Sequence, residues 1–497
     1  MKSSNSRPSR ILQNPFILEL NLTTAQKIQI GVMSLTVFPV RLLLFASSMM
    51  LAWVFALIGL WSRSETVVEP KTLWIRIIDL CFQMSTRAMW FFCGFHWVKV
   101  KGQRADPSEA SILVMAPHSA FFDAITVSTT LCSFVTKESA KSVPIWKSII
   151  QYLRPVYVFR ADQDSRKRTV EEIKHRATSR EPWPQLIIYP EGTCSNRAGL
   201  ILFKAGAFIP GLPVQPAVLR YANKLDTISW TWHAPGLPTL VWLSMCQLHN
   251  SFELEYLPVY TPSQEEKENP SLFANNVRKL MAKALDVPLI DLSFDDRHVI
   301  MSNGPLGICN FSCLLEFNQL VSRLGLKTGS NASVLKEKAT KARKLQGQLL
   351  SVEDFAQILG LPVSDILRQL HTMFDQEDGH IDYRHYVIAL STVCQTAETK
   401  ENLKLAFQMY QNEEDGSVTE KDLATILEIM LGVENIELGG LFQSLQEDTG
   451  RITYDQLCQF VDQHPDFAEN YIRFKNHSST FSSGRAKING NDQKKRD

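Results

Sequence analysis

The chain has 497 residues, 45% of them hydrophobic and 21% charged, and its formal net charge is +1. This length allows two or three domains with a sizeable core, and the balanced charge argues against nucleic acid as a partner. The nine cysteines include no CxxC pair, which is typical of a reduced, cytosol-facing protein. No HExxH or zinc-finger spacing occurs, so the sequence predicts no zinc site.

The N-terminal region is strongly apolar. Residues 42–61 contain no charged side chain, and this length matches a helix that crosses a hydrocarbon core of roughly 30 Å. Residues 28–40 are also apolar and are interrupted at Pro39-Val-Arg41, so two helices folded as a hairpin in one leaflet are the alternative to a spanning helix. Residues 74–95 mix charges with Trp and Phe, which suits an interfacial helix.

Residues 96–293 alternate short apolar runs with amphipathic stretches, as an α/β domain does. The expected strands are Ile112–Met115, Val156–Phe159, Leu186–Tyr189, Val214–Leu219 and Phe252–Leu257. The expected helices are Ser119–Leu131, Ser165–Thr178 and Phe273–Leu285. Polar residues follow several of these strands, which is where α/β folds place their sites.

Composition shifts divide the rest of the chain. The expected segments are an N-terminal tail at 1–27, a membrane-anchoring region at 28–95, a linker at 294–345, an all-α domain at 346–476 and a disordered tail at 477–497.

The first chemical signal is the pair His118 and Asp123, which follows an apolar strand. Histidine can move a proton near neutral pH, and a carboxylate can fix its tautomer. Five positions along one helix rotate a side chain by about 500°, so the two residues would face apart on a regular helix. We therefore expect His118 in a turn, Ser119 as the helix cap and Asp123 in the first helical turns. On these residues alone, a capped helix with a solvated aspartate is an equal reading.

Two further strand ends carry polar groups. In a Pro-Glu-Gly-Thr turn, Glu191 and Gly192 can present a carboxylate and open backbone N–H groups to a polar ligand, with Thr193 and Arg197 as donors. Arg160 ends another strand, where a guanidinium can pair with a phosphate. Taken singly, the Glu191 segment is equally compatible with an ordinary glycine turn, and an isolated arginine such as Arg160 is more often a surface charge.

In this order, the blocks resemble the glycerolipid acyltransferase superfamily, with its HxxxxD motif, a strand ending in arginine, a Pro-Glu-Gly turn and a proline-containing strand, here Leu212-Pro-Val-Gln-Pro216. Other stretches are similar to the lysophosphatidylcholine acyltransferases of types 1 and 2, over most of the chain. They are Asp162–Arg166, Phe203–Pro210, Arg220–Asp226 and Trp230–Trp232. The resemblance implies an α/β acyltransferase domain with a mixed sheet flanked by helices, behind an N-terminal membrane helix or hairpin.

The resemblance also implies a reaction. A fatty acyl group would pass from acyl-CoA, the co-substrate, to the hydroxyl of a lysophospholipid, and lysophosphatidylcholine is the expected acceptor. Because a lipid hydroxyl is a poor nucleophile at neutral pH, His118 is expected to act as general base and Asp123 to orient it. The residues that the resemblance assigns to the acceptor's polar head are Arg160, Glu191, Gly192 and Thr193.

One position departs from relatives that acylate lysophosphatidic acid. Those enzymes commonly have an arginine after Glu-Gly-Thr, whereas this chain has Cys194, which offers no cationic clamp for a bare phosphomonoester. A zwitterionic choline headgroup fits better, with Arg197 in reach of its phosphate. Lys204 and the run Arg166–Arg168 stay open between contact with CoA phosphates and a solvated surface.

Three segments of the C-terminal half have the glycine and β-branched centre of an EF-hand loop. They centre on Gly379, Gly416 and Gly450. A working loop supplies oxygen ligands at positions 1, 3, 5 and 12 around a glycine at position 6. In the middle loop these four positions are Gln411, Glu413, Asp415 and Asp422. That loop allows weak calcium binding. The first loop is one residue short and the third has too few carboxylates, so both are expected to be helix pairs without metal.

The chain ends in Lys494-Lys-Arg-Asp497, which resembles the dilysine signal that retrieval coats recognise on the cytosolic side of the endoplasmic reticulum. We expect a protein of that membrane with its catalytic and C-terminal regions in the cytosol. The Golgi membrane and the lipid-droplet surface are alternative locations.

Three classes of protein compete. A membrane-bound acyltransferase accounts for all four blocks, and acetyl transfer to lyso-platelet-activating factor is an alternative activity within that class. A lipid hydrolase would use Cys194 or a serine with His118, but the sequence has no GxSxG elbow. A calcium-responsive scaffold would carry an inactive acyltransferase-like domain, although His118 and Asp123 are intact.

Overall fold

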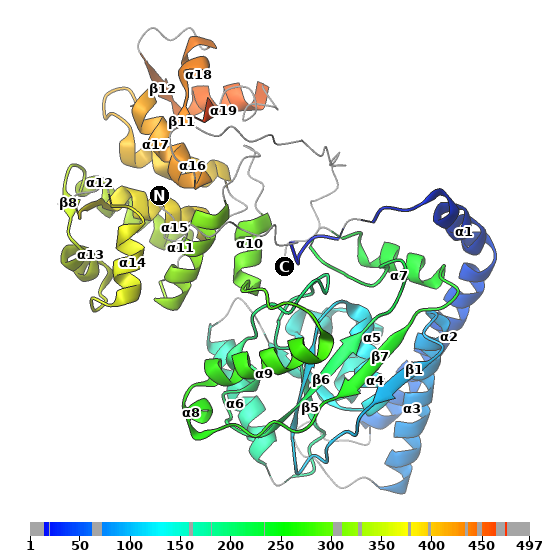
Figure 1. Cartoon of the computed structure of the whole chain (residues 1–497). Coiled ribbons are helices and arrows are strands. Elements are labelled where there is room, and N and C mark those ends of the chain that lie inside the picture. Colours follow the sequence, from blue (N-terminus) through cyan, green and yellow to red (C-terminus); the bar gives the residue numbers. More distant parts are fainter. Residues whose placement is uncertain are drawn as a thin grey trace. The chain divides into compact units, whose positions relative to one another are not determined.

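The computed structural model describes residues 14–18, 20–61, 72–158, 163–179, 181–232, 234–301, 311–326, 331–375, 379–395, 399–432, 436–444, 450–463 and 473–474. The chain forms two compact units that divide after Arg297. The first unit holds the apolar N-terminal helices together with the predicted α/β domain, and the second holds the C-terminal helices (Figure 1).

A seven-stranded mixed sheet forms the centre of the first unit, in the order β1-β7-β6-β2-β5-β3-β4. Its strands are β1 Val98–Lys101, β2 Ile112–Ala116, β3 Ser133–Lys137, β4 Val156–Val158, β5 Leu186–Ile188, β6 Val214–Arg220 and β7 Phe252–Tyr256. Neighbours pair in parallel, except that β6 and β7 are antiparallel. The five predicted strands and the mixed sheet are confirmed, whereas β1 and β3 were not predicted.

Helices cover both faces of the sheet, because every side chain of β2 is buried and adjacent ones point to opposite faces. On one face, Leu113 and Met115 share a core with residues of α3 Leu73–Phe92, α4 Ala124–Thr130 and α7 Leu237–Met245. On the other face, Ile112 and Val114 share a core with residues of α6 Gln163–Thr178 and α9 Pro270–Leu285. The strand carrying His118 beyond its end is thus at the centre of the domain.

The apolar N-terminal region forms three helices, α1 Thr24–Leu35, α2 Val37–Trp61 and α3. In the described part of the chain, α2 alone is long and apolar enough to cross a membrane. The predicted break at Pro39 is wrong in position, since the helix axis changes at Thr36 and Pro39 lies in the first turn of α2, where its missing N–H is tolerated. The predicted N-terminal tail also has structure, because Phe16 is fully buried.

The long helix α2 does not stand apart from the α/β domain. It packs along α3 and along α5 Pro144–Tyr152. Gly59 of α2 meets the Tyr152 ring so closely that a Cβ would overlap it, and the Tyr152 hydroxyl donates to Asp79 of α3 at 2.5 Å. At the other end of α2, the Arg41 guanidinium donates to the main-chain carbonyls of Met245, the last residue of α7, and Leu248, three residues further on, at 2.8 and 3.1 Å.

The second unit is mainly helical. Its helices are α11 Phe311–Arg323, α12 Ala332–Lys344, α13 Val352–Leu359, α14 Asp365–Thr372, α15 Tyr383–Cys394, α16 Thr399–Tyr410, α17 Glu420–Leu431, α18 Gly439–Ser444 and α19 Tyr454–Gln463. Short antiparallel strand pairs join β8 Leu349–Leu350 to β9 Ile381–Asp382, β10 Ser417–Thr419 to β12 Arg451–Thr453, and β11 Ile436–Glu437 to β13 Arg473–Phe474.

The segment predicted as a linker, 294–345, is instead largely helical. It contains α10 Phe294–Met301, α11 and α12. Phe317 of α11 and Ala342 of α12 are fully buried in the core of the second unit. The amphipathic spacing of these residues, rather than the many lysines between them, decides their structure.

Candidate active site

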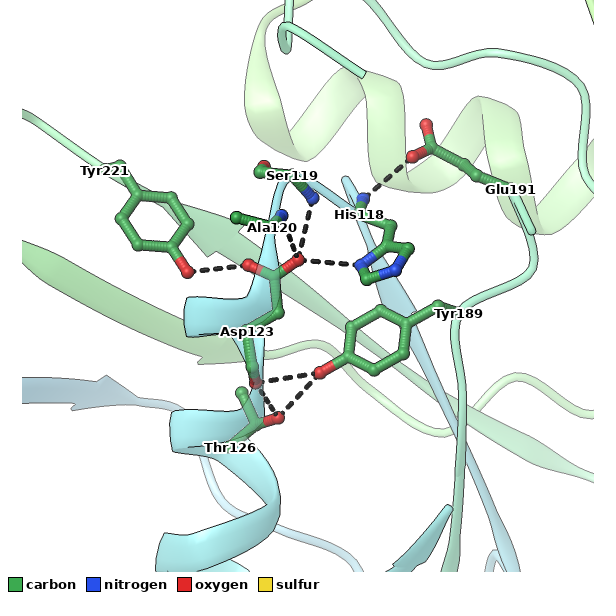
Figure 2. A network of polar contacts seen from close by, with 8 residues as sticks. All are labelled: His118, Ser119, Ala120, Asp123, Thr126, Tyr189, Glu191 and Tyr221. Carbon is green, nitrogen blue, oxygen red and sulfur yellow. Dashed lines mark hydrogen bonds and ion pairs between the residues drawn. The ribbon is translucent and has the colours of Figure 1, made fainter. Parts of the chain in front are cut away.

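The predicted pair, His118 and Asp123, meets at the carboxyl end of β2 (Figure 2). His118 Nδ1 lies 2.8 Å from Asp123 Oδ2, and the imidazole is 27% exposed whereas the carboxylate is 1% exposed. An ionised carboxylate accepts the Nδ1 proton, which leaves Nε2 of the neutral ring free to take a proton from a substrate. The geometry is that of a general base with a buried orienting group.

The loop between His118 and the helix differs from the predicted cap. Ser119 does not cap the helix; instead, Asp123 Oδ2 accepts the backbone N–H groups of Ser119 and Ala120 at 2.7 and 3.1 Å. A single 3-10 turn, Phe121–Asp123, precedes α4. These bonds bend the chain back, so His118 and Asp123 meet without sharing a regular helix.

Two tyrosines complete this network, and the sequence analysis assigned neither of them a role. The Tyr221 hydroxyl donates to Asp123 Oδ1 at 2.6 Å, and the Tyr189 hydroxyl donates to the Asp123 carbonyl at 2.9 Å. The Tyr189 ring also stacks on the imidazole of His118 at 4.6 Å between centroids. Burial raises the pKa of both phenols well above their usual value, so they remain donors at neutral pH. Their positions directly after β5 and β6 were the available signal.

Cys194 lies against His118. Its side chain hydrogen-bonds the imidazole, and the next residue, Ser195, donates its N–H to the His118 carbonyl at 2.8 Å. Burial lowers the pKa of His118, but the electrostatic and hydrogen-bond contributions of Cys194 and Asp123 outweigh burial and raise that pKa well above its usual value. His118 is therefore a stronger base here than in water.

Glu191 points into the protein rather than toward solvent. Its side chain is fully buried, and its carboxylate accepts the N–H of His118 at 2.7 Å and the N–H of Ile201 at 3.3 Å. Burial raises the pKa of Glu191 to about 7, against the opposing effect of these hydrogen bonds. The parallel pairing of β2 and β5 brings the two strand ends together, so the glutamate of one turn holds the backbone of the histidine in the other.

The next two residues of the turn face basic side chains. Gly192 has φ +65°, and a Cβ there would lie 3.0 Å from Cε of Lys204, so glycine allows both the turn and this close approach. Thr193 Oγ1 accepts a hydrogen bond from Arg297 Nη1 at 3.3 Å. Arg297 lies in the segment predicted as a linker, and no local sequence signal indicates its position beside the turn.

The structure places Arg197 on a different set of partners. Its Nη2 pairs with Asp226 Oδ2 at 2.9 Å, and its guanidinium lies 5.1 Å from the centre of the Tyr221 ring. Arg197 therefore braces the ring that bonds Asp123. Arg160, the other predicted arginine, lies outside the described residues.

The four predicted calcium ligands do not converge. The Glu413 carboxylate pairs with Arg343 at 3.2 Å, and Asp415 accepts hydrogen bonds from Ser417. Asp422 accepts from Thr419 at 2.7 Å at the start of α17, and Gln411 bonds the end of α16 through its N–H. Among the described residues, no group of three or more His, Cys, Asp or Glu side chains is arranged to hold a metal ion.

The site and fold define a class of protein that comparison supports. A family model described as Acyltransferase matches residues 97–220, which include β1 to β6 with His118, Asp123 and Glu191. The first unit therefore contains an acyltransferase domain, and the protein is an enzyme that transfers acyl groups.

The relatives define the family more narrowly. The chain is 52% identical to lysophosphatidylcholine acyltransferase 1 of Danio rerio, over 95% of this chain and 91% of that protein. It is 48% identical to lysophosphatidylcholine acyltransferase 1 of Homo sapiens, over 95% and 89% of the two chains. Lysophosphatidylcholine acyltransferase 2 of Homo sapiens is 41% identical, over 93% and 85%. This chain belongs to the lysophosphatidylcholine acyltransferase family.

Proposed function

We propose that this enzyme transfers a long-chain acyl group from acyl-CoA to the free hydroxyl of lysophosphatidylcholine and so forms phosphatidylcholine. The observation that carries the proposal is the partly exposed imidazole of His118, held by buried Asp123, in a chain similar to lysophosphatidylcholine acyltransferases over almost its whole length.

The chain's own residues perform the proton transfer. His118 Nε2 takes the hydroxyl proton as the lipid oxygen bonds to the thioester carbonyl, and Asp123 stabilises the imidazolium. The carbon–sulfur bond then breaks, and the imidazolium returns the proton to the CoA thiolate. A positioned base contributes about 10²–10⁴-fold, so orientation of the two substrates must supply the rest of the acceleration.

The decisive experiment measures phosphatidylcholine formation by membranes that contain the full chain, with palmitoyl-CoA and lysophosphatidylcholine. His118→Ala is expected to abolish transfer, and His175→Ala, at an exposed histidine of α6, is the matched control. Full turnover by His118→Ala would remove that residue from the mechanism. A hydrolase would instead release free fatty acid without an acceptor, and an inactive scaffold would show neither reaction. Competition between acetyl-CoA and palmitoyl-CoA measures acetyl transfer.

We further propose that α2 and α3 anchor the enzyme as a hairpin in one leaflet. The support is that α2 is joined to the α/β domain at both ends, through Arg41 and through Gly59, so a spanning helix would have to break these contacts. The lipid-facing side chains would be those that remain exposed, among them Leu43, Leu51 and Trp61 of α2 and Trp74 and Met84 of α3.

We propose the cytosolic side of the endoplasmic reticulum as its location, with Golgi membrane and lipid droplet as alternatives. The support is the basic ending at Lys494 and Lys495, whose recognition by retrieval coats is part of the same proposal. These residues lie outside the described part of the chain.

For the second unit we propose EF-hand-like helix pairs that are stable without calcium. The paired strands β10 and β12 set Val418 opposite Ile452, each two residues after a glycine of positive φ, Gly416 and Gly450. The Arg451 Nε lies 3.9 Å from Asp415 Oδ2 and brings a positive charge to the loop in which a calcium ion would sit. Calcium titration of the full chain tests this proposal, and saturable heat at millimolar calcium would contradict it.

A further inference from the structure

The turn that holds the catalytic histidine through Glu191 also fixes two basic side chains. Lys204 donates its N–H to the Pro190 carbonyl at 2.8 Å, and its aliphatic stem lies against Gly192. Arg297 donates from Nη1 to Thr193 Oγ1 at 3.3 Å. Lys204 lies in the loop before β6 and Arg297 lies in α10. Only the tertiary structure brings these two cations together.

Aromatic rings hold these two positive charges close to each other. The Arg297 guanidinium lies 4.4 Å from the ring centres of both Trp232 and Phe294. The Lys204 ammonium lies 4.6 Å from the same Phe294 ring. Cation–π contacts stabilise each charge, but two cations on one ring repel each other, and an anion between them would relieve that repulsion.

The position of the pair relates it to the reaction. Ser195, two residues after Thr193, donates its N–H to the His118 carbonyl at 2.8 Å, and two residues of chain span at most about 7 Å. In a glycerophospholipid, one carbon and one ester oxygen separate the hydroxyl-bearing carbon from the phosphorus. An acceptor whose hydroxyl meets His118 would therefore carry its phosphate into the neighbourhood of this turn.

We propose that Arg297 and Lys204 form a subsite for a phosphate group of a substrate. This inference rests on the proposed function, whose substrates supply two phosphate sources, the phosphodiester of the lysolipid and the phosphates of CoA. The short distance between hydroxyl and phosphate favours the lysolipid. The subsite supplies cations that the Glu-Gly-Thr-Cys sequence itself lacks, because Cys194 is shorter than an arginine and carries no positive charge.

The test is steady-state kinetics of the full chain in membranes with the variants Arg297→Gln and Lys204→Gln. The matched control is Lys279→Gln, at an exposed lysine of α9. Loss of one charge-assisted phosphate contact is expected to raise the KM for lysophosphatidylcholine about tenfold or more, with kcat little changed. Transfer to monoacylglycerol, which has no phosphate, should be equal in the variants and the wild type.

The two phosphate sources give different results. The KM for acyl-CoA can rise instead, with no such effect for acyl-pantetheine, which lacks the phosphates of CoA. In that case the subsite is supported and its ligand is CoA. Unchanged KM values for both substrates in both variants, or an equal loss in Lys279→Gln, would overturn the subsite. A fall in kcat alone would do so as well, because it would show that the side chains only support the turn.

Failure of the proposed function gives a separate signature, since the wild type would then form no phosphatidylcholine. Calorimetry of CoA binding to the purified full chain still tests the subsite in that case. Weaker binding of CoA, or of lysophosphatidylcholine in a second titration, by Arg297→Gln and Lys204→Gln than by the wild type supports phosphate binding. Equal binding of both ligands by all three proteins overturns it.

Discussion

The proton affinity of His118 is set by neighbours from different parts of the chain. Asp123 holds Nδ1 from the next helix, Cys194 meets the ring from the turn after β5, and Tyr189 covers one face. Burial lowers the pKa of the imidazole, and the two groups that can carry negative charge raise it by more. The residue next to the Glu-Gly-Thr sequence therefore tunes the base, in addition to any effect on substrate choice.

This environment predicts the pH dependence of the enzyme. The base acts only when neutral, so kcat/KM is expected to rise with pH through the raised pKa of His118 and to be lost as pH falls through it. Cys194→Ser removes a group that raises this pKa, so the rising limb should move to lower pH while acyl transfer continues. Rate profiles between about pH 5 and 9 measure the shift.

The same variant separates transferase from hydrolase chemistry. A nucleophilic Cys194 would make Cys194→Ser inactive or strongly impaired at every pH, because serine is a far weaker nucleophile beside the same base. Cys246→Ser, at a buried cysteine that contacts Ser34 of α1, serves as the control substitution. A rising limb that stays in place would show that Cys194 has no influence on His118.

At the scale of the elements, parallel strand ends assemble the site. β2 pairs in parallel with both β5 and β6, so their carboxyl ends meet at one edge and bring His118, Glu191 and Tyr221 together. Glu191 contributes by holding the backbone of His118. The acceptor-binding role that the family resemblance assigns to Glu191 stays a prediction, while the neighbouring Thr193 contacts a cation suited to a phosphate.

The contact between α2 and α5 leads to a stability prediction. Gly59→Ala puts a methyl group into the Tyr152 ring, and such overpacking is expected to lower the free energy of unfolding by about 1–3 kcal/mol. Gly31→Ala makes the same change in α1, where no atom lies within 4 Å of the added Cβ, and should be neutral or stabilising by up to about 1 kcal/mol. Thermal unfolding of the two variants in detergent provides the comparison.

Equal behaviour of Gly59→Ala and Gly31→Ala would contradict the packing. It would mean that α2 leaves the α/β domain in the membrane and that Gly59 then faces lipid. Acyl transfer well below the unfolding temperature should be unaffected in both variants, because neither glycine contacts the His118 network.

At the scale of the whole molecule, the apolar N-terminal helices and the acyltransferase domain are one compact unit. This arrangement explains why Arg41 and Asp79 occur in otherwise apolar segments. Arg41 donates to the carbonyl of Met245 at the end of α7, and Asp79 accepts a hydrogen bond from Tyr152. Charged residues in such segments are costly to expose to lipid and are satisfied here by the domain itself.

A one-leaflet hairpin makes a topology prediction. Tags at both ends of the chain should be accessible to antibody after the plasma membrane alone is permeabilised, and a sequon introduced between α2 and α3 should remain unglycosylated. A lumenal marker protein controls for intact internal membranes. Glycosylation of the sequon would show that the connection reaches the lumen and that both helices span.

Much of the organisation was predictable because it follows local chemistry. The strands 112–115 and 214–219 are continuous apolar runs, and residues 42–61 are an uncharged helix-length segment, so their structure depends little on distant residues. The turn between α12 and α13 at Gly347, another glycine of positive φ, was missed because its loop has no acidic residue. The helical character of 294–345 was missed because the many lysines of α12 obscure the apolar spacing of Leu335, Ala339 and Ala342, whose burial in the second unit is a tertiary property.

By itself, the sequence determined the order of the four blocks, the apolar N-terminal segment and the prediction of a histidine base with an orienting carboxylate, because each depends on residue type and short spacing. Only the tertiary structure decided which groups surround these residues. Tyr221 donates a hydrogen bond to Asp123, and Glu191 accepts one from the backbone of His118. Arg297 donates to the Thr193 hydroxyl. The physical reason is that parallel strand pairing, and packing of α10 against the turn after β5, join residues up to 104 positions apart, and no local pattern in the chain encodes those contacts.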